Sequence, residues 1–212
     1  MKLNKNKFLY YGSFNPITLG HKHVIDMVFK KFGKDIYIFV EAVNELYYPP
    51  KKDILIPIAQ RHNMMFDTIC GYQNVVVGVA SLLEARHVKW YDLAQKHDAR
   101  NIIIGSDNLK TIEKYYSTKG EYIQDMLENC NIIVVNRDGF DSKEYVKNSE
   151  KLSGYRNRFT FLKPEKEFCS SSQVREKIKN NKNFSQDVHE EVYKYVNKYN
   201  FYKGSNSEVN VN

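Results

Sequence analysis

Two short stretches, one near each end of the chain, contain residue types that bind phosphate. The first is GSFNPITLGH, residues 12–21, in which Thr18 and His21 stand three residues apart at the start of a predicted helix. That spacing places both side chains on one helix face, and an imidazole N–H can donate to a phosphoryl oxygen. Gly12 lets the backbone approach an anion closely. The stretch therefore predicts a phosphate site where a strand passes into a helix, because free N–H groups and the positive end of the helix dipole meet there.

The second stretch is CSSSQVR, residues 169–175. Its serines stand where a helix N-cap belongs, and Arg175 follows a few residues later. A single histidine beside a core is more often structural than functional. The functional interpretation of His21 therefore depends on the presence of this second stretch. The chain has neither a GxxxxGK[ST] P-loop nor a GxGxxG dinucleotide fingerprint, so any phosphate would be bound by other means.

The elements that must position these stretches alternate between strand and helix. Near-continuous apolar runs predict strands at Phe8–Tyr11, Ile36–Val40, Val75–Val79, Asn101–Asp107 and Ile132–Val135, with a short candidate at Phe159–Leu162. Amphipathic patterns predict helices at His21–Phe32, Ile58–Ile69, Ser81–His97, Leu109–Tyr116, Glu121–Asn129, Ser170–Lys179 and Asp187–Tyr199. Strands that are apolar throughout are covered on both faces, as in a parallel sheet. The chain is therefore predicted to be a doubly wound α/β fold with right-handed crossovers.

The remaining segments divide into turns and polar surface. Asn44–Asp53 is a predicted loop with two prolines and two lysines, and Asp141–Asn157 is a predicted variable surface segment. No linker divides the chain, so we expect one domain over residues 1–204 and a disordered tail over 205–212. Ligands of open parallel sheets bind beyond the carboxyl ends of the strands, where Gly12-Ser13 and Gly105-Ser106-Asp107 both fall.

Composition restricts the classes of partner. The net charge of +7, from 32 basic and 25 acidic residues among 212, favours anionic partners, although a solvated basic face explains it equally well. No basic run with interleaved aromatic residues is present, so nucleic acid is not expected. The three cysteines are far apart and form no CxxC pair, which indicates a reducing compartment. Without a signal peptide or a membrane span, we expect a cytoplasmic protein that does not contact membranes.

The two phosphate-type stretches resemble a known pair of signatures. GSFNPITLGH resembles the [HT]xGH signature of the nucleotidyltransferase α/β-phosphodiesterase superfamily, and CSSSQVR resembles the ISSTxxR signature of its adenylyltransferases. Within that superfamily the chain is most similar to the nicotinate- or nicotinamide-mononucleotide adenylyltransferases, from Phe8 to Tyr202. The resemblance implies a Rossmann-like nucleotidyltransferase fold. It also implies an enzyme of NAD biosynthesis that joins ATP to a pyridine mononucleotide and releases pyrophosphate.

The resemblance further implies roles for named residues. His21, Thr18 and Arg175 would be catalytic. ATP would contact Gly12, Ser13, Phe14, Gly20, His21, Gly105, Asp107, Ser171, Ser172 and Arg175, and the mononucleotide would contact Asn44, Lys51, Tyr115 and Arg137. No residue is assigned as a metal ligand, since Mg²⁺ would travel mainly on the ATP phosphates. The resemblance leaves a homo-oligomer open.

The chain departs from the family pattern at several positions. Asn15 replaces the usual aspartate, Thr18 the first histidine and Cys169 an isoleucine. The Ser-Tyr-Thr segment of the nicotinate enzymes has no match near Arg86–Asp92, and Tyr115 or the adjacent Tyr116 stands in for the expected tryptophan. The alternatives are phosphopantetheine adenylyltransferase, a nucleotide-binding sensor without turnover, and an RNA-binding protein.

Overall fold

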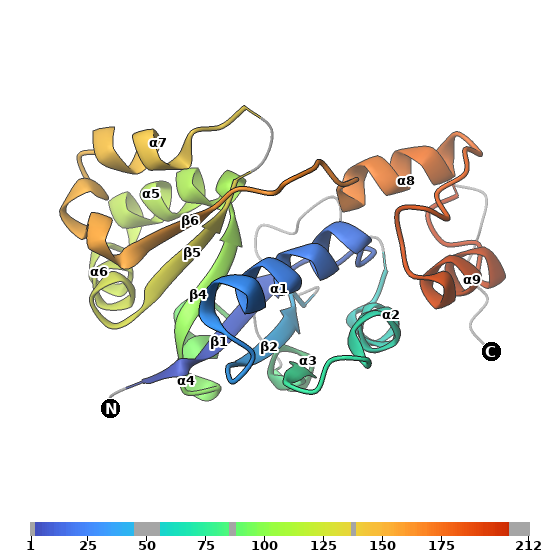
Figure 1. Ribbon diagram of the computed structural model, residues 1–212, viewed down its shortest axis with the longest axis horizontal. Helices are drawn as coiled ribbons and strands as arrows, with labels where there is room; N and C mark the ends of the chain where they lie inside the picture. The colour runs from blue at the N-terminus through green and yellow to red at the C-terminus, as the bar shows by residue number, and fades with distance from the viewer. Residues whose placement is uncertain (1–2, 45–55, 85–87, 137–138, 204–212) are drawn as a thin grey trace.

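Six parallel strands form one central sheet in the computed structural model, which describes residues 3–44, 56–84, 88–136 and 139–203 (Figure 1). The strands are β1 (Asn4–Gly12), β2 (Tyr37–Ala42), β3 (Val75–Val77), β4 (Ala99–Gly105), β5 (Asn131–Val135) and β6 (Phe159–Leu162). Their order in the sheet is β3-β2-β1-β4-β5-β6, and each neighbouring pair is parallel. The chain runs outward from β1 to β3 and then returns to place β4 beside β1. This reversal between β1 and β4 is the switch point at which doubly wound sheets bind ligands.

Helices cover both faces of the sheet. They are α1 (Leu19–Phe32), α2 (Ile58–Ile69), α3 (Ala80–Leu83), α4 (Trp90–Lys96), α5 (Leu109–Thr118), α6 (Gly120–Asn129), α7 (Ser142–Asn148), α8 (Ser171–Lys179) and α9 (Glu190–Lys198). There are also two 3-10 turns. The first, η1 (Ser106–Asn108), directly follows β4, and the second, η2 (Ser153–Arg158), directly precedes β6. One core contains residues of α1, α2, α8 and α9, and the other contains residues of α4, α5, α6 and α7.

The central strand β1 shows why the run Phe8–Tyr11 in its second half is apolar at every position. Phe8 and Tyr10 belong to the core under α1 and α2, whereas Leu9 and Tyr11 belong to the core on the opposite face. Successive side chains of a strand point to opposite faces, so a strand covered on both sides buries all four. The predicted doubly wound α/β fold is confirmed.

The predicted helix over Ser81–His97 is wrong. The structure has two short helices there, because Glu84 takes an extended conformation (ψ 131°) that ends α3. The side chain of Glu41, on β2, accepts hydrogen bonds from the N–H groups of Ala80 (2.9 Å) and Ser81 (3.1 Å). A contact from a distant strand therefore fixes where α3 begins.

Two smaller predictions, both strand ends, are also corrected. The fourth strand ends at Gly105, since residues 106–108 form η1, and the third ends at Val77. The segment over Asp141–Asn157, expected to be variable surface, contains α7 and η2. Asp141 caps α7, and Val146 and Leu152 are buried in the second core, which holds the segment on the sheet. None of the helices in the described parts of the chain is long and apolar enough to cross a bilayer.

Candidate active site

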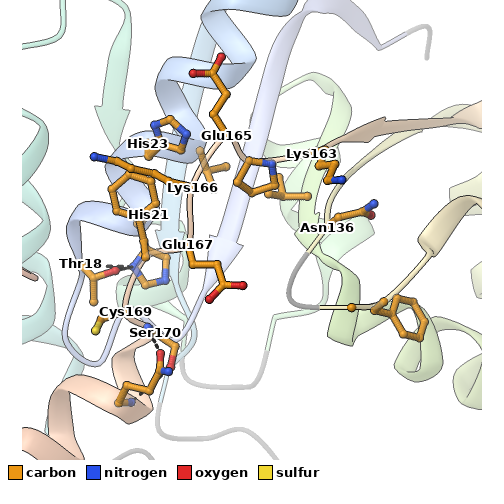
Figure 2. A pocket seen from close by; sticks show the side chains of 18 of the residues that line it. Thr18, His21, His23, Asn136, Lys163, Glu165, Lys166, Glu167, Cys169 and Ser170 are labelled. Atoms are coloured by element: carbon orange, nitrogen blue, oxygen red, sulfur yellow. Dashed lines mark hydrogen bonds between the residues drawn. The ribbon is translucent and has the colours of Figure 1, made fainter.

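The turn between β1 and α1 orients the imidazole of His21. Thr18 is the N-cap of α1, and its backbone N–H donates to Nδ1 of His21 at 3.0 Å. The Thr18 hydroxyl lies 2.9 Å from the same Nδ1 (Figure 2). A backbone N–H can only donate, so Nδ1 accepts and the ring proton of the neutral imidazole lies on Nε2. The local fold therefore fixes both the tautomer and the orientation of the neutral ring.

Aromatic packing fixes the position of the same ring. Phe14 is fully buried, and its ring meets that of His21 edge-on with centroids 5.0 Å apart. A Cβ on Gly12 would lie 3.2 Å from the Phe14 ring, so glycine makes room for this packing. Gly12 thus supports the site by accommodating Phe14.

Side chains from distant elements brace the backbone of the turn through its carbonyl groups. The guanidinium of Arg61, on α2, is fully buried and donates to the carbonyl oxygen of Ser13 at 2.7 Å. Arg175, on α8, donates to the carbonyl of Asn15 at 2.7 Å, and Ser171 donates to that of Pro16 at 2.8 Å. The two phosphate-type stretches of the sequence are therefore in direct contact.

The second stretch begins α8 with a capping box. The Ser170 hydroxyl accepts from the backbone N–H of Gln173 at 3.2 Å, and the Gln173 side chain accepts from the Ser170 N–H at 2.7 Å. Arg175 also donates to the Ser172 hydroxyl at 3.1 Å. This cap fixes the direction of α8 and places Arg175 against the turn before α1.

A cavity of about 780 Å³ opens beside the start of α1 (Figure 2). Thr18, Gly20, His21 and His23 line it from α1 and its cap, Asn136 lines it from the end of β5, and residues 163–170 line it from the segment before α8. This volume falls in the range of small-ligand sites. Nε2 of His23 and Oδ1 of Asn136 are buried side-chain atoms without a hydrogen-bond partner among the described residues, so both are available to a ligand.

Gly20 allows the segment before α8 to lie against α1. A Cβ at this position would lie 2.9 Å from the Cβ of Phe168 and 3.5 Å from the carbonyl oxygen of Cys169. The Phe168 ring packs against His23 with centroids 4.6 Å apart, and the Lys166 ammonium lies 4.9 Å from the Phe168 ring centroid. One wall of the cavity is therefore aromatic, with the Lys166 ammonium over the Phe168 ring.

The comparisons with known proteins agree with this arrangement. A family model described as cytidylyltransferase-like matches residues 9–177. The chain belongs to this family. The match covers both the β1–α1 turn and Arg175 in α8.

Similar proteins cover nearly the whole chain. A protein of Clostridium novyi named "Probable nicotinate-nucleotide adenylyltransferase" is 28% identical over 207 residues, which are 94% of this chain and 100% of that protein. One of the same name from Clostridium acetobutylicum is 27% identical, covering 93% and 99%. The structure of Plasmodium falciparum nicotinic acid mononucleotide adenylyltransferase complexed with NaAD superposes with a TM-score of 0.69 at 22% identity, covering 94% and 98%. That likeness supports the Rossmann-like nucleotidyltransferase fold.

The predicted catalytic and ATP-binding residues fall into two groups. Thr18, Gly20 and His21 line the cavity. The others are not part of its lining: Gly12, Ser13 and Phe14 lie in the turn, Ser171, Ser172 and Arg175 at the start of α8, Gly105 at the end of β4 and Asp107 in η1. Asp107 is exposed. Their roles toward ATP stay predictions.

The predicted mononucleotide contacts are more widely spread. Asn44 is buried just after β2, and its amide donates to the Ser81 carbonyl at 3.2 Å. Tyr115 lies on α5, beside the second core. Lys51 and Arg137 lie outside the described residues. These four assignments also stay predictions.

Sequence reasoning missed His23, Asn136, Phe168 and the bracing role of Arg61. His23 follows His21 by two residues, so its helix face differs from the phosphate-facing one. Arg61 had a weak signal, since a charged residue interrupts the apolar face of α2. In the part of the chain that the structure describes, no three His, Cys, Asp or Glu side chains are grouped to hold a metal ion.

Proposed function

We propose that this protein is an adenylyltransferase of NAD biosynthesis that joins ATP to nicotinate mononucleotide or nicotinamide mononucleotide. The products are the dinucleotide and pyrophosphate. The observation that carries the proposal is the imidazole of His21, which Thr18 orients at the edge of a nucleotide-sized cavity. The names of the full-length relatives support the choice of substrates.

The reaction needs positioning more than it needs acid–base chemistry. A phosphate oxygen of the mononucleotide forms a bond to the α-phosphorus of ATP, and the bond from that phosphorus to the bridging oxygen of pyrophosphate breaks. The attacking phosphate is already anionic near neutral pH, so no proton has to be removed. The protein must align the two reactants and stabilise the negative charge that develops on the leaving pyrophosphate.

The triphosphate would lie against the start of α1. His21 would donate through Nε2–H, and Gly20, in the first helical turn beside the cavity, would offer a backbone N–H near the positive end of the helix dipole. Arg175 uses two of its donors on Asn15 and Ser172, and a guanidinium carries five N–H groups, so donors remain for phosphate oxygens. Its charge and that of Arg61 both favour an anion at this turn.

The adenine base would enter the aromatic side of the cavity. The ring of Phe168 offers a stacking surface, and the amide of Asn136 can both accept from and donate to a purine edge. The mononucleotide would then approach from the other side of the β1–β4 switch point, where Asn44, Lys51, Tyr115 and Arg137 are its predicted contacts.

We also propose that Mg²⁺ arrives bound to ATP. Mg²⁺ keeps several waters and prefers phosphate and carboxylate oxygens in octahedral geometry, which the triphosphate supplies. When bound, the ion would neutralise phosphate charge. We further propose that the protein works in the cytoplasm, which three free cysteines support.

The deciding experiment measures pyrophosphate release from ATP with nicotinate mononucleotide, nicotinamide mononucleotide or phosphopantetheine as the acceptor. We expect release with a pyridine mononucleotide. Release with phosphopantetheine alone would instead assign the chain to coenzyme A biosynthesis. Calorimetric ATP binding without release for any acceptor would indicate a nucleotide sensor.

A further inference from the structure

The segment that follows α9 returns to the turn before α1. The hydroxyl of Tyr202 donates to Oδ1 of Asn15 at 2.7 Å, across 187 positions of sequence. Asn15 is 1% exposed, so this hydrogen bond is shielded from water. Phe201, next to Tyr202, is buried in the core beneath α1 and α2, which anchors the segment. The contact is therefore part of the packed structure.

Asn15 connects Tyr202 to the second phosphate-type stretch. Its side chain accepts from Tyr202, and its backbone carbonyl accepts from the guanidinium of Arg175. Burial raises the pKa of Tyr202, against the opposing effect of the nearby Arg175 and Arg61 charges. The phenol therefore stays protonated at neutral pH and remains a donor. Asn15, which departs from the aspartate of the resembling family, has a partner suited to a neutral amide.

The same part of the chain holds the turn at a second point. The backbone carbonyl of Asp187, before α9, accepts from the N–H of Leu19 in the first turn of α1 at 2.8 Å. The Asp187 carboxylate is paired with Lys177 of α8 at 2.5 Å. Residues 187–202 thus contact both ends of the stretch from Asn15 to Leu19.

We propose that Tyr202 is a positioning residue for adenylyl transfer, which sets the Asn15 carbonyl and through it the guanidinium of Arg175. This inference rests on the function proposed above. Without the hydroxyl, the buried Asn15 oxygen loses this donor and the turn can take other arrangements. Arg175 would then reach the triphosphate in fewer molecules, which lowers the rate of transfer more than the affinity for the mononucleotide.

The test compares two single-atom deletions on the same segment. Tyr202→Phe removes the hydroxyl that contacts Asn15. Tyr199→Phe removes the hydroxyl of a residue that is 44% exposed and whose ring stacks on Phe201. Steady-state rates of pyrophosphate release are measured for both at temperatures below each melting transition. We expect Tyr202→Phe to lower kcat about 10-fold with little change in KM for the mononucleotide, and Tyr199→Phe to match the wild type.

A double-mutant cycle with Asn15→Ala separates positioning from general destabilisation. If Tyr202 acts through Asn15, the double variant is no slower than the slower single variant. Losses in kcat that multiply in the double variant would overturn the proposal. So would a Tyr202→Phe protein with wild-type kcat. Should Tyr202→Phe not fold, Asn15→Ala breaks the same hydrogen bond from the other side, and wild-type kcat in that folded variant would also overturn it.

The wild-type enzyme in the same series separates this inference from the proposed function. No pyrophosphate release by the wild type with any acceptor overturns the function. Release by the wild type and by Tyr202→Phe at equal rates overturns only the role of Tyr202.

Discussion

Replacing Gly20 with alanine tests how the cavity is built. The new Cβ would lie 2.9 Å from the Cβ of Phe168, a carbon fixed to the backbone that cannot rotate away. Carbon atoms pack best at about 3.5 Å or more, so the segment before α8 must move by roughly 0.6 Å. That segment carries Cys169 and Ser170, which line the cavity. The substitution therefore widens the gap between α1 and the opposite wall.

Two opposing contributions determine how much Gly20→Ala changes the stability of the protein. Overpacking costs about 1–3 kcal/mol, and the preference of a helix for alanine over glycine returns up to about 1 kcal/mol. A net loss of roughly 1–2 kcal/mol lowers the Tm of a chain of this length by about 5 °C. A displacement of about 1 Å in an active site costs roughly 100-fold, so we expect kcat/KM for ATP to fall about 10-fold.

The matched control is Gly120→Ala at the start of α6, where a Cβ would meet nothing within 4 Å. We expect this variant to be as stable as the wild type or slightly more stable, with unchanged kcat/KM. Thermal unfolding and pyrophosphate release are measured for both variants. If Gly20→Ala behaves like Gly120→Ala in both assays, the close approach of Phe168 to α1 does not shape the cavity.

Three further predictions concern other parts of the structure. His21→Ala removes the oriented Nε2–H and should lower kcat about 100-fold or more. The near-ultraviolet circular dichroism spectrum should stay unchanged, which shows that the variant is folded. Near wild-type turnover would exclude His21 from the chemistry. Gly78→Ala should lower the free energy of unfolding by about 3 kcal/mol, because the new Cβ would lie 2.2 Å from an oxygen of the fully buried Glu41. An unchanged midpoint in a denaturant titration would contradict this prediction. Burial lowers the pKa of His62, and the charge of Glu41 opposes this effect. Below about pH 6.5 the unfolded chain therefore binds more protons at this residue than the folded chain does, so the free energy of unfolding decreases as the pH falls. Urea titrations at pH 7 and pH 5 should show a smaller loss for His62→Gln than for the wild type, and equal losses would assign the pH dependence elsewhere.

Local patterns in the sequence determined most of the fold. The inner strands β1, β2, β4 and β5 contain apolar runs because both of their faces are covered, and that pattern is visible without knowing the neighbours. The start of α8 was predicted from Ser170–Ser172, since a helix cap needs only residues within one turn. Alternation of these elements was sufficient for the doubly wound topology.

The boundary of α3 depended on a contact that no local pattern contains. Glu41 accepts from the first N–H groups of α3 from a strand 39 and 40 residues away, so the sequence around Ser81 did not reveal where this short helix begins. A fully buried carboxylate in a strand would not be expected from composition, because its burial is stabilised only by partners that the fold supplies.

In the β1–α1 turn, too, the local sequence predicted some features and the tertiary structure decided others. Its sequence alone predicted a phosphate site and proposed Thr18 and His21 as its residues, because both lie within one helical turn. Only the tertiary structure decided that Thr18 orients the His21 ring, and that Arg61 and Tyr202, 48 and 187 residues beyond their partners, hold the turn. Arginine on an amphipathic helix and tyrosine near a chain end are usually exposed, and nothing in their neighbouring residues shows otherwise. Their contacts with the turn depend on the path of the whole chain, which brings α2 and the segment after α9 to the same end of the sheet.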